Sequence, residues 1–175
     1  MPTITRQIAD WVAKPDAPPR RVLEEAKNQI LCMLAAVHAG HFSDAGRIVT
    51  RTVKEWSGGK EATLIPSGER TAVHYALAAN SALALALDYD DYMFGARTGP
   101  AAVLTTLAVA EKLGSSGVEF LTAQVLANEV GGRLGLATSL AVGDAPMASF
   151  VSLAAGAVVG ASLMKLDAAQ TEHAL

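Results

Sequence analysis

Apolar residues recur every three or four positions along most of the chain, which is the spacing of one helix face. Ile4, Ile8 and Val12 show this spacing in a first helix, which must end at the prolines that follow because proline cannot continue a helix. Pro19 suits the first turn of a second helix, and Gly40 is expected to close it. The pattern therefore predicts two helices at the start of the chain.

Turn residues divide the rest of the chain into further helices. Ser43 or Asp44 is expected to cap a third helix, which Gly58 ends. Ala62–Ile65 is the one stretch with strand character. Four more helices are expected over residues 71–87, 100–114, 117–140 and 146–166. The sequence thus predicts an all-α fold, a single helical domain over residues 1–175 with about seven helices.

Two of these segments, Thr71–Leu87 and Ala145–Met164, carry no formal charge. Both are rich in Ala, Gly and Ser, and they hold few of the Leu, Ile and Phe side chains that favour insertion into a bilayer. We therefore expect helices buried on all sides, with small residues that let their backbones pack closely, and no membrane partner. The glycines of Val130–Gly135 are interpreted in the same way, because no strand precedes them as a phosphate-binding loop requires.

Composition narrows the class of protein further. Of the 175 residues 51% are hydrophobic and 18% charged, which is the opposite of a disordered chain. The net charge is −3 without a cluster of Lys or Arg, so no nucleic-acid partner is expected. Charged residues interrupt the first 20 positions, which excludes a signal-peptide core there and favours a cytoplasmic location.

The last predicted helix begins at Asp167, in the position of an N-cap, and runs only to Leu175. A helix of about two turns is marginal alone, and its apolar residues need a surface to pack against. We therefore expect a larger polypeptide, a second protein chain that supplies the rest of the fold, or a homo-oligomer.

The most unusual local feature is the run of residues 88–92, which places three aspartates at the end of an uncharged helix. The helix dipole disfavours negative charge there. Such a cluster suits proton transfer, a hydrogen-bonded anchor or a cation site, and an acidic solvated loop is an equal alternative. Arg97 lies close by in sequence and either pairs with an aspartate or binds a carboxylate ligand, although a surface ion pair is the commoner case.

Other reactive side chains point to ordinary structural roles. His38 and His41 lie three residues apart, but no carboxylate or cysteine at ligand spacing completes a metal site, so none is expected. His74 is interpreted as a core histidine. Cys32, the single cysteine, cannot form an intramolecular disulfide and is interpreted as a buried, inert thiol.

Five segments, taken together and in this order, match motifs of one known family: Ile30–Gly40, Asn80–Asp91, Ala101–Gly114, Phe120–Gly135 and Lys165–Leu175. The chain resembles the MmgE/PrpD family, which includes 2-methylcitrate dehydratase, cis-aconitate decarboxylase and iminodisuccinate epimerase. The resemblance spans all 175 residues and about the first two-fifths of a typical member. It implies a helical domain without the smaller α/β domain that closes the active-site cleft in family members.

The resemblance also implies chemistry. Family members act without cofactor or metal on polycarboxylic acids, and they remove water, carbon dioxide or a proton by acid–base catalysis. Asp88 matches the first aspartate of the family motif, Asp90 and Asp91 match its Asp-Asp pair, and Tyr92 stands where threonine is usual.

Three histidines of the family are replaced in this chain, by Leu85, Thr98 and Ala145, and the lysine-bearing segment lies beyond residue 175. Neither threonine nor alanine acts as a base near neutral pH, and the loss of a positioned acid–base group costs about 10²–10⁴ in rate. The usual reaction is therefore not expected from this chain alone.

Three interpretations follow. The chain is one subunit of a split lyase or isomerase, its cleft has been adapted to another reaction, or it is an inactive helical subunit with a binding or assembly role. In an enzyme for a small carboxylic acid, Asp88 or Asp91 would transfer the proton or orient the group that does. Tyr92 would donate a hydrogen bond, while Arg97 and Thr98 would bind the substrate, Arg97 as the anion clamp.

Overall fold

The computed structural model describes residues 1–56, 58–142 and 148–175. It confirms the all-α prediction, with eight α-helices in this described part where about seven were expected. The helices are α1 (Ile4–Ala13), α2 (Arg20–His41), α3 (Asp44–Trp56), α4 (Val73–Leu85), α5 (Thr105–Leu113), α6 (Gly117–Val142), α7 (Ala148–Leu163) and α8 (Ala168–Ala174). A π-helical turn, η1 (Pro100–Leu104), leads directly into α5, and two short strands, β1 (Ala62–Thr63) and β2 (Arg70–Thr71), pair antiparallel.

Side chains close the ends of several helices. Thr3 caps α1 by accepting a hydrogen bond from the backbone N–H of Arg6 (3.1 Å). For α3 the cap is Ser43, the first of the two predicted residues, whose Oγ accepts from the N–H of Gly46 (3.0 Å). Gly114 adopts a positive φ of 66° at the end of α5, as expected of a C-terminal glycine.

Helix α4 begins at Val73, later than predicted, because a β-hairpin precedes it. Thr71 was expected to open that helix, but it lies in β2, and its carbonyl accepts from the N–H of Glu61 (3.0 Å). The side chain of Glu61 then accepts from the N–H of Val73 (3.2 Å), at the first residue of α4. Asn80 of α4 holds the other strand, because its side-chain amide donates to the carbonyl of Thr63 (2.9 Å).

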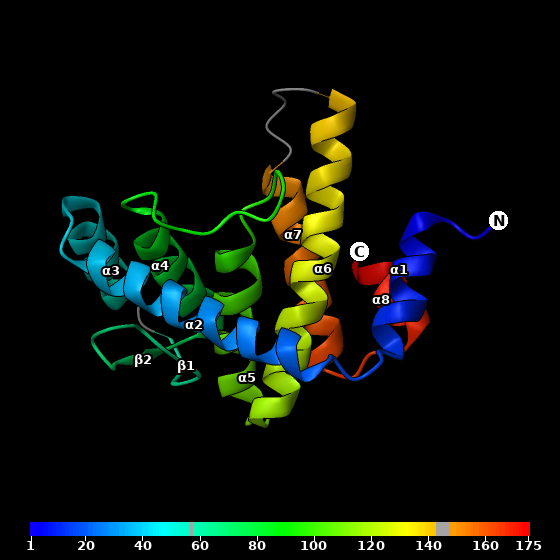
Figure 1. The fold of residues 1–175 in the computed structure, drawn as a ribbon. Coiled ribbons are helices and arrows are strands. Elements are labelled where there is room, and N and C mark those ends of the chain that lie inside the picture. Colours follow the sequence, from blue (N-terminus) through cyan, green and yellow to red (C-terminus); the bar gives the residue numbers. More distant parts are fainter. Residues whose placement is uncertain (57, 143–147) are drawn as a thin grey trace.

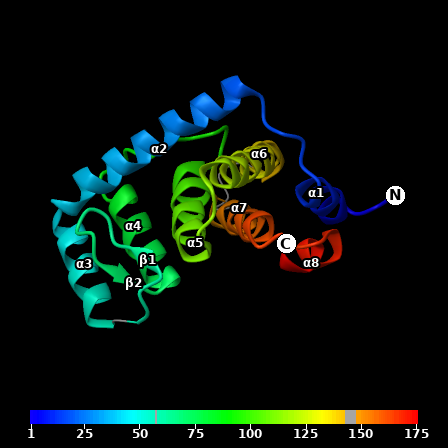
Figure 2. The ribbon, with the colours of Figure 1, turned by 90° about the horizontal axis from the view of Figure 1, so that it is seen from below.

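The helices form a row that α2 crosses. Figure 2 shows α4, α5, α6 and α7 nearly end-on, with α2 lying across them, α3 and the hairpin at one end and α1 and α8 at the other. The largest apolar cluster joins α1, η1, α6 and α7, and two smaller clusters lie around α2 with α4 and around α3 with β1.

Gly40 shows why small residues matter here. It was expected to close α2, but the helix continues to His41 and Gly40 is buried within it. A Cβ atom at this position would lie 1.9 Å from the backbone oxygen of Leu83 in α4. Because no side chain fits, glycine allows the two helices to cross in backbone contact.

A further chain was expected because no surface for the last helix, α8, to pack against was evident from the sequence. The structure provides that surface within the same chain. Helix α8 packs beside α1 (Figures 1 and 2), and Thr171 on its inner face is fully buried. Asp167 caps it as predicted, in a reciprocal capping box with Gln170. Arg6 of α1 pairs with Glu172 of α8 at 3.2 Å, so the two helices are also linked at their surface.

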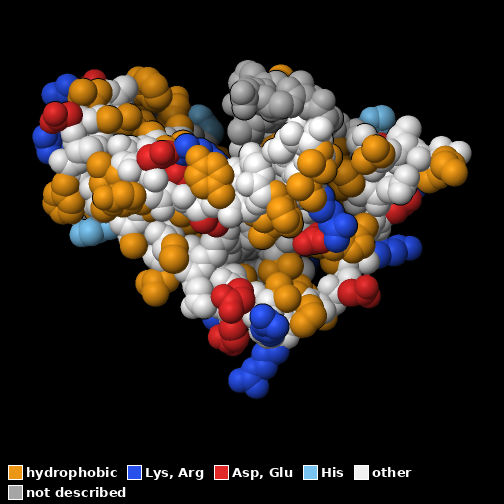
Figure 3. All heavy atoms as spheres, turned by 45° about the horizontal axis from the view of Figure 1, so that its top comes forward, with side chains coloured by type: hydrophobic (Ala, Val, Ile, Leu, Met, Phe, Trp, Pro, Cys, Tyr) orange, Lys and Arg blue, Asp and Glu red, His pale blue; other side chains and the backbone are white. Residues whose placement is uncertain are grey.

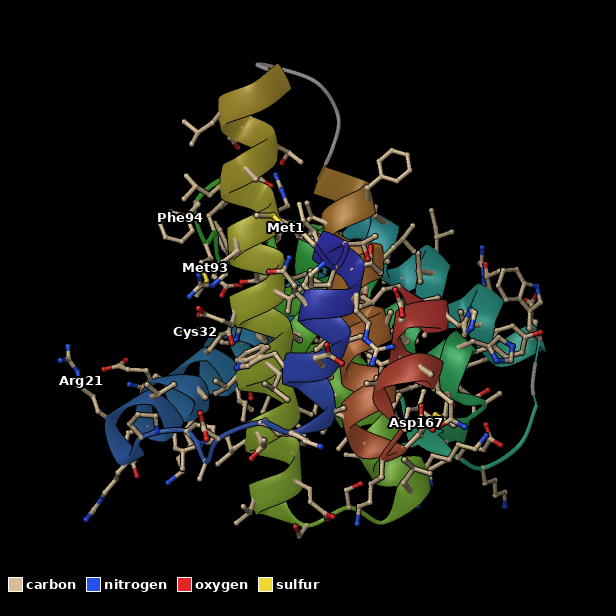
Figure 4. All side chains as sticks on the ribbon, turned by 90° about the vertical axis from the view of Figure 1, so that its right-hand side faces the viewer. Met1, Arg21, Cys32, Met93, Phe94 and Asp167 are labelled. Carbon is tan, nitrogen blue, oxygen red and sulfur yellow. The ribbon has the colours of Figure 1, made fainter. Side chains whose placement is uncertain are left out.

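Two side chains differ from their predicted surroundings. Cys32 is exposed on α2 rather than buried (Figure 4), because a helix turns by about 100° per residue and so places it beside the buried stripe of Met33 and Val37 rather than within it. His74 is likewise exposed, near the start of α4, with its ring 4.1 Å from that of Tyr75. None of the described helices combines the length and apolar character that crossing a membrane requires.

Candidate active site: the acidic loop after α4

The segment of residues 86–99, which we call the acidic loop, links α4 to η1 and carries the three clustered aspartates. Asp88 and Phe94 adopt left-handed backbone conformations, with φ of 56° and 55°. Met93 and Ala96 exchange two backbone hydrogen bonds, of 2.9 and 3.1 Å, which close a tight turn. Within this loop the three aspartate side chains lie in three different environments.

Asp90 is the buried member of the cluster, with a side chain that is 0% exposed. Its Oδ1 lies 2.9 Å from Nη1 of Arg97, and its Oδ2 has no hydrogen-bond partner. Burial raises the pKa of Asp90 above its ordinary value, and the positive charge of Arg97 opposes that rise.

Arg97 links the loop to itself. Its Nη1 also lies 2.6 Å from Oδ1 of the exposed Asp88, and the hydrogen bond to Asp88 raises the pKa of Arg97. The guanidinium carbon is 4.9 Å from the centre of the Tyr92 ring, which faces solvent. The structure thus brings together Asp88, Asp90, Tyr92 and Arg97, and one guanidinium nitrogen is shared by two carboxylates.

Asp91 turns away from this group toward α2. Its Oδ2 accepts a hydrogen bond from Nε2 of Gln29, whereas its Oδ1 is buried without a partner. A Cβ atom on Gly99 would lie 2.0 Å from that Oδ1, so glycine is required for the close approach. Asp91 is therefore fixed between α2 and the start of η1.

Thr98, which stands where the family motif has a histidine, is 1% exposed, and its Oγ1 has no partner. Its methyl group lies 3.4 Å from where a Cβ on Gly131 of α6 would be. Its assignment to substrate binding remains a prediction. Ala145, at the second histidine position, lies outside the described residues.

The glycines of α6 receive the acidic loop as well as a helix. Gly131 faces Ala155 of α7, as the predicted close packing requires. A Cβ on Gly132 would lie 2.5 Å from the sulfur of Met93, and one on Gly135 would lie 2.6 Å from the Cβ of Ala96. Figure 4 shows Met93 and Phe94 beside α6. These small residues therefore seat the loop against the helix.

Three amide side chains that the sequence did not single out support Asp91. Gln124 and Asn128 lie four residues apart on α6, and both donate to Oε1 of Gln29, at 2.8 and 2.7 Å. Beside them is an open cavity of about 270 Å³, whose lining includes Gln29, Asp91 and Asn128. The sequence does carry a signal for these side chains. Gln124 and Asn128 are amides four residues apart in a largely apolar helix, and amides buried on such a face need hydrogen-bond partners.

Among residues 1–56, 58–142 and 148–175, no group of three or more His, Cys, Asp and Glu side chains is arranged to hold a metal ion. The acidic loop is instead bordered by apolar side chains that face solvent: Leu85, Leu87, Tyr89, Tyr92 and Phe94. Figure 3 shows many such hydrophobic side chains on one face of the molecule, among scattered charged groups.

Fold and loop together define a class of protein, a helical domain that holds an aspartate cluster in the loop between α4 and η1. The family model of the MmgE/PrpD N-terminal domain matches residues 6–175. The chain therefore belongs to the MmgE/PrpD family, as its motifs indicated. No curated protein matches the chain in sequence.

Proposed function

We propose that the chain is the helical part of an MmgE/PrpD-type lyase or isomerase, which acts on a small carboxylic acid by cofactor-free acid–base chemistry. The observation that supports this most directly is that Asp90 and Asp91 each have one buried carboxylate oxygen without a partner. Buried polar atoms are normally satisfied, so two orphaned oxygens on neighbouring residues favour a functional role.

Within this proposal Asp91 transfers the proton, because its other oxygen is held by Gln29 and its orientation is therefore fixed. Asp88 and Asp90 both pair with Arg97. When Arg97 exchanges one of these aspartates for a carboxylate of the substrate, it serves as the anion clamp. Tyr92, exposed beside Arg97, is the hydrogen-bond donor.

Charge supports a second chain as the partner. The acidic loop holds three aspartates but one arginine, which pairs with Asp88 and Asp90, so the loop is negative and repels a carboxylate substrate. Additional cations are needed to bind such a substrate, and the exposed apolar side chains around the loop give a partner a surface to cover. A second polypeptide, or another copy of this one, would supply both.

An inactive subunit with an assembly role is the competing function. Thr98 favours it, since a buried threonine stands where the family places a histidine and cannot act as a base near neutral pH. Leu85, at another family histidine position, is equally unable to move a proton.

Mass analysis of the native chain with whatever co-purifies tests the partner, and turnover of di- and tricarboxylic acids by that assembly tests the activity. In an enzyme, Asp91→Asn should lower kcat by about 10²- to 10⁴-fold. Asp16→Asn, an exposed aspartate in the α1–α2 connection, is the matched control and should leave kcat unchanged. A stable assembly that turns over none of these acids would overturn the proposal in favour of the inactive subunit, and an Asp91→Asn protein with full activity would refute Asp91 as the group that transfers the proton.

A further inference from the structure

A line of amide groups, buried at Gln124 and Asn128 and half-buried at Gln29, connects a backbone carbonyl of α2 to the carboxylate of Asp91. Nε2 of Gln124, a fully buried side chain, donates to the carbonyl of Ala26 at 2.9 Å and to Oε1 of Gln29 at 2.8 Å. Nδ2 of Asn128 donates to the same Oε1 at 2.7 Å. Nε2 of Gln29 then donates to Oδ2 of Asp91 and to Oδ1 of Asn128 (3.1 Å).

The direction of these hydrogen bonds is fixed by chemistry. A backbone carbonyl only accepts, so the group that Gln124 turns toward Ala26 must be its NH₂. That NH₂ also meets Gln29, so the atom of Gln29 that receives it must be the amide oxygen. The other end of Gln29, which faces Asp91, is therefore a donor. An inverted Gln29 would place its NH₂ against the NH₂ of Gln124 and its oxygen against a carboxylate.

The consequence falls on Asp91. Because Oδ2 receives a hydrogen from Gln29, a proton on this carboxyl group is favoured on Oδ1, the buried oxygen beside Gly99. We propose that Gln29, held by Gln124 and Asn128, is the positioning residue of Asp91 and biases the proton of this carboxyl group toward Oδ1. This rests on the proposed function, in which Asp91 transfers the proton, and it adds how the fold orients that group.

The first test needs no substrate. In the ¹⁵N-labelled full chain, replacing Asp91 with Ala should shift the side-chain NH₂ resonances of Gln29 and accelerate their exchange with water by about tenfold or more, because a charge-assisted bond is lost. Asp88→Ala, which alters the same loop but not this contact, should leave them unchanged. If the Gln29 resonances respond equally to both variants, or to neither, the proposed contact is absent and the proposal fails.

The second test uses turnover by the native assembly. Gln29→Met is close in size but cannot donate, so Asp91 should lose its fixed orientation, kcat should fall about 10- to 100-fold, KM should stay within about threefold, and the pH–rate profile should shift. Gln29→Glu, which keeps the shape and replaces the donor with an acceptor, repeats the test if the methionine variant folds poorly. Asn28→Met, at the exposed neighbouring position on α2, is the matched control.

The outcomes are distinguishable. A Gln29→Met protein that keeps kcat and its pH profile while losing only stability would show that the amide line is structural, and would overturn the positioning role. An assembly without any turnover refutes the proposed function and with it the role of Oδ1 in proton transfer, while the resonance experiment still decides whether Gln29 orients Asp91.

Discussion

Three neighbouring aspartates of one loop differ because their surroundings differ. Asp88 is exposed and paired, Asp90 is buried and paired, and Asp91 is bound to an amide. The raised pKa of Asp90 shows that desolvation outweighs the nearby arginine. Residue type alone therefore says little about which carboxylate is reactive, and the contact that each one makes decides it.

Arg97 should be important for stability, since it is the counter-ion of a buried carboxylate. Arg97→Met leaves Asp90 buried without a partner, and we expect a loss of about 2 kcal/mol in the free energy of unfolding, below the range for a fully buried pair because Arg97 is 33% exposed. Urea denaturation measures it. Arg133→Met, which removes the exposed ion pair with Glu129, should cost less than about 0.5 kcal/mol, and equal losses in the two variants would contradict this account.

At the scale of elements, the sequence predicts the helices well and their mutual approach poorly. Apolar periodicity, Ser43, Asp167 and Gly114 place helix ends close to where they lie, because capping and left-handed backbone are local properties. The strand Arg70–Thr71 and the interior position of Gly40 were not predictable, since both depend on contacts distant in the sequence. For the same reason the acidic loop was located but its amide support was missed.

Gly40 provides a direct test of the α2–α4 crossing. Gly40→Ala puts a methyl group into the backbone of Leu83, and we expect a loss of about 3 kcal/mol because backbone, unlike a side chain, cannot rotate away. The control is Gly156→Ala in α7, where no atom lies within 4 Å of the new Cβ. That change should stabilise the protein by about 0.5–1 kcal/mol through helix propensity, so thermal melts of the two variants should move in opposite directions.

The start of α6 should make stability depend on pH. The backbone N–H of Ser116 and the ammonium of Lys165, which both bind the carboxylate of Glu119, lower its pKa from 4.5 to about 2. The folded protein then binds fewer protons than the unfolded chain, so this contribution is complete above pH 4.5 and is lost as pH falls toward 2. Glu119→Gln removes it, and the gap between the denaturation curves of wild type and variant should close over that range. A gap that stays constant would exclude Glu119 as the titrating group.

For the whole molecule, the two ends of the chain form one unit. The first and last helices pack together, and Thr3 and Arg6 both reach Glu172. This pairing gives the last helix a surface within the same chain. The argument for a partner therefore rests on the exposed side chains around the acidic loop and not on α8.

Asp167 tests whether this unit is cooperative. Asp167→Ala removes the capping box of α8 and should lower stability by about 1 kcal/mol. Because α8 lies on α1, hydrogen exchange should accelerate in both helices and not in α3. Asp16→Ala serves as the control outside any cap, and faster exchange confined to α8 would mean that the two helices open independently.

The meeting of the two ends has a topological consequence. Oγ1 of Thr3 and Oε1 of Glu172 are 3.5 Å apart, so a glycine-rich linker that joins α8 back to α1 could close residues 1–175 into a ring without straining either helix. New termini could then be opened in the exposed turn at Ser67, between the strands of the hairpin. Such a circular permutant should keep the fold, because the order in which the helices are synthesised is not what holds them in place.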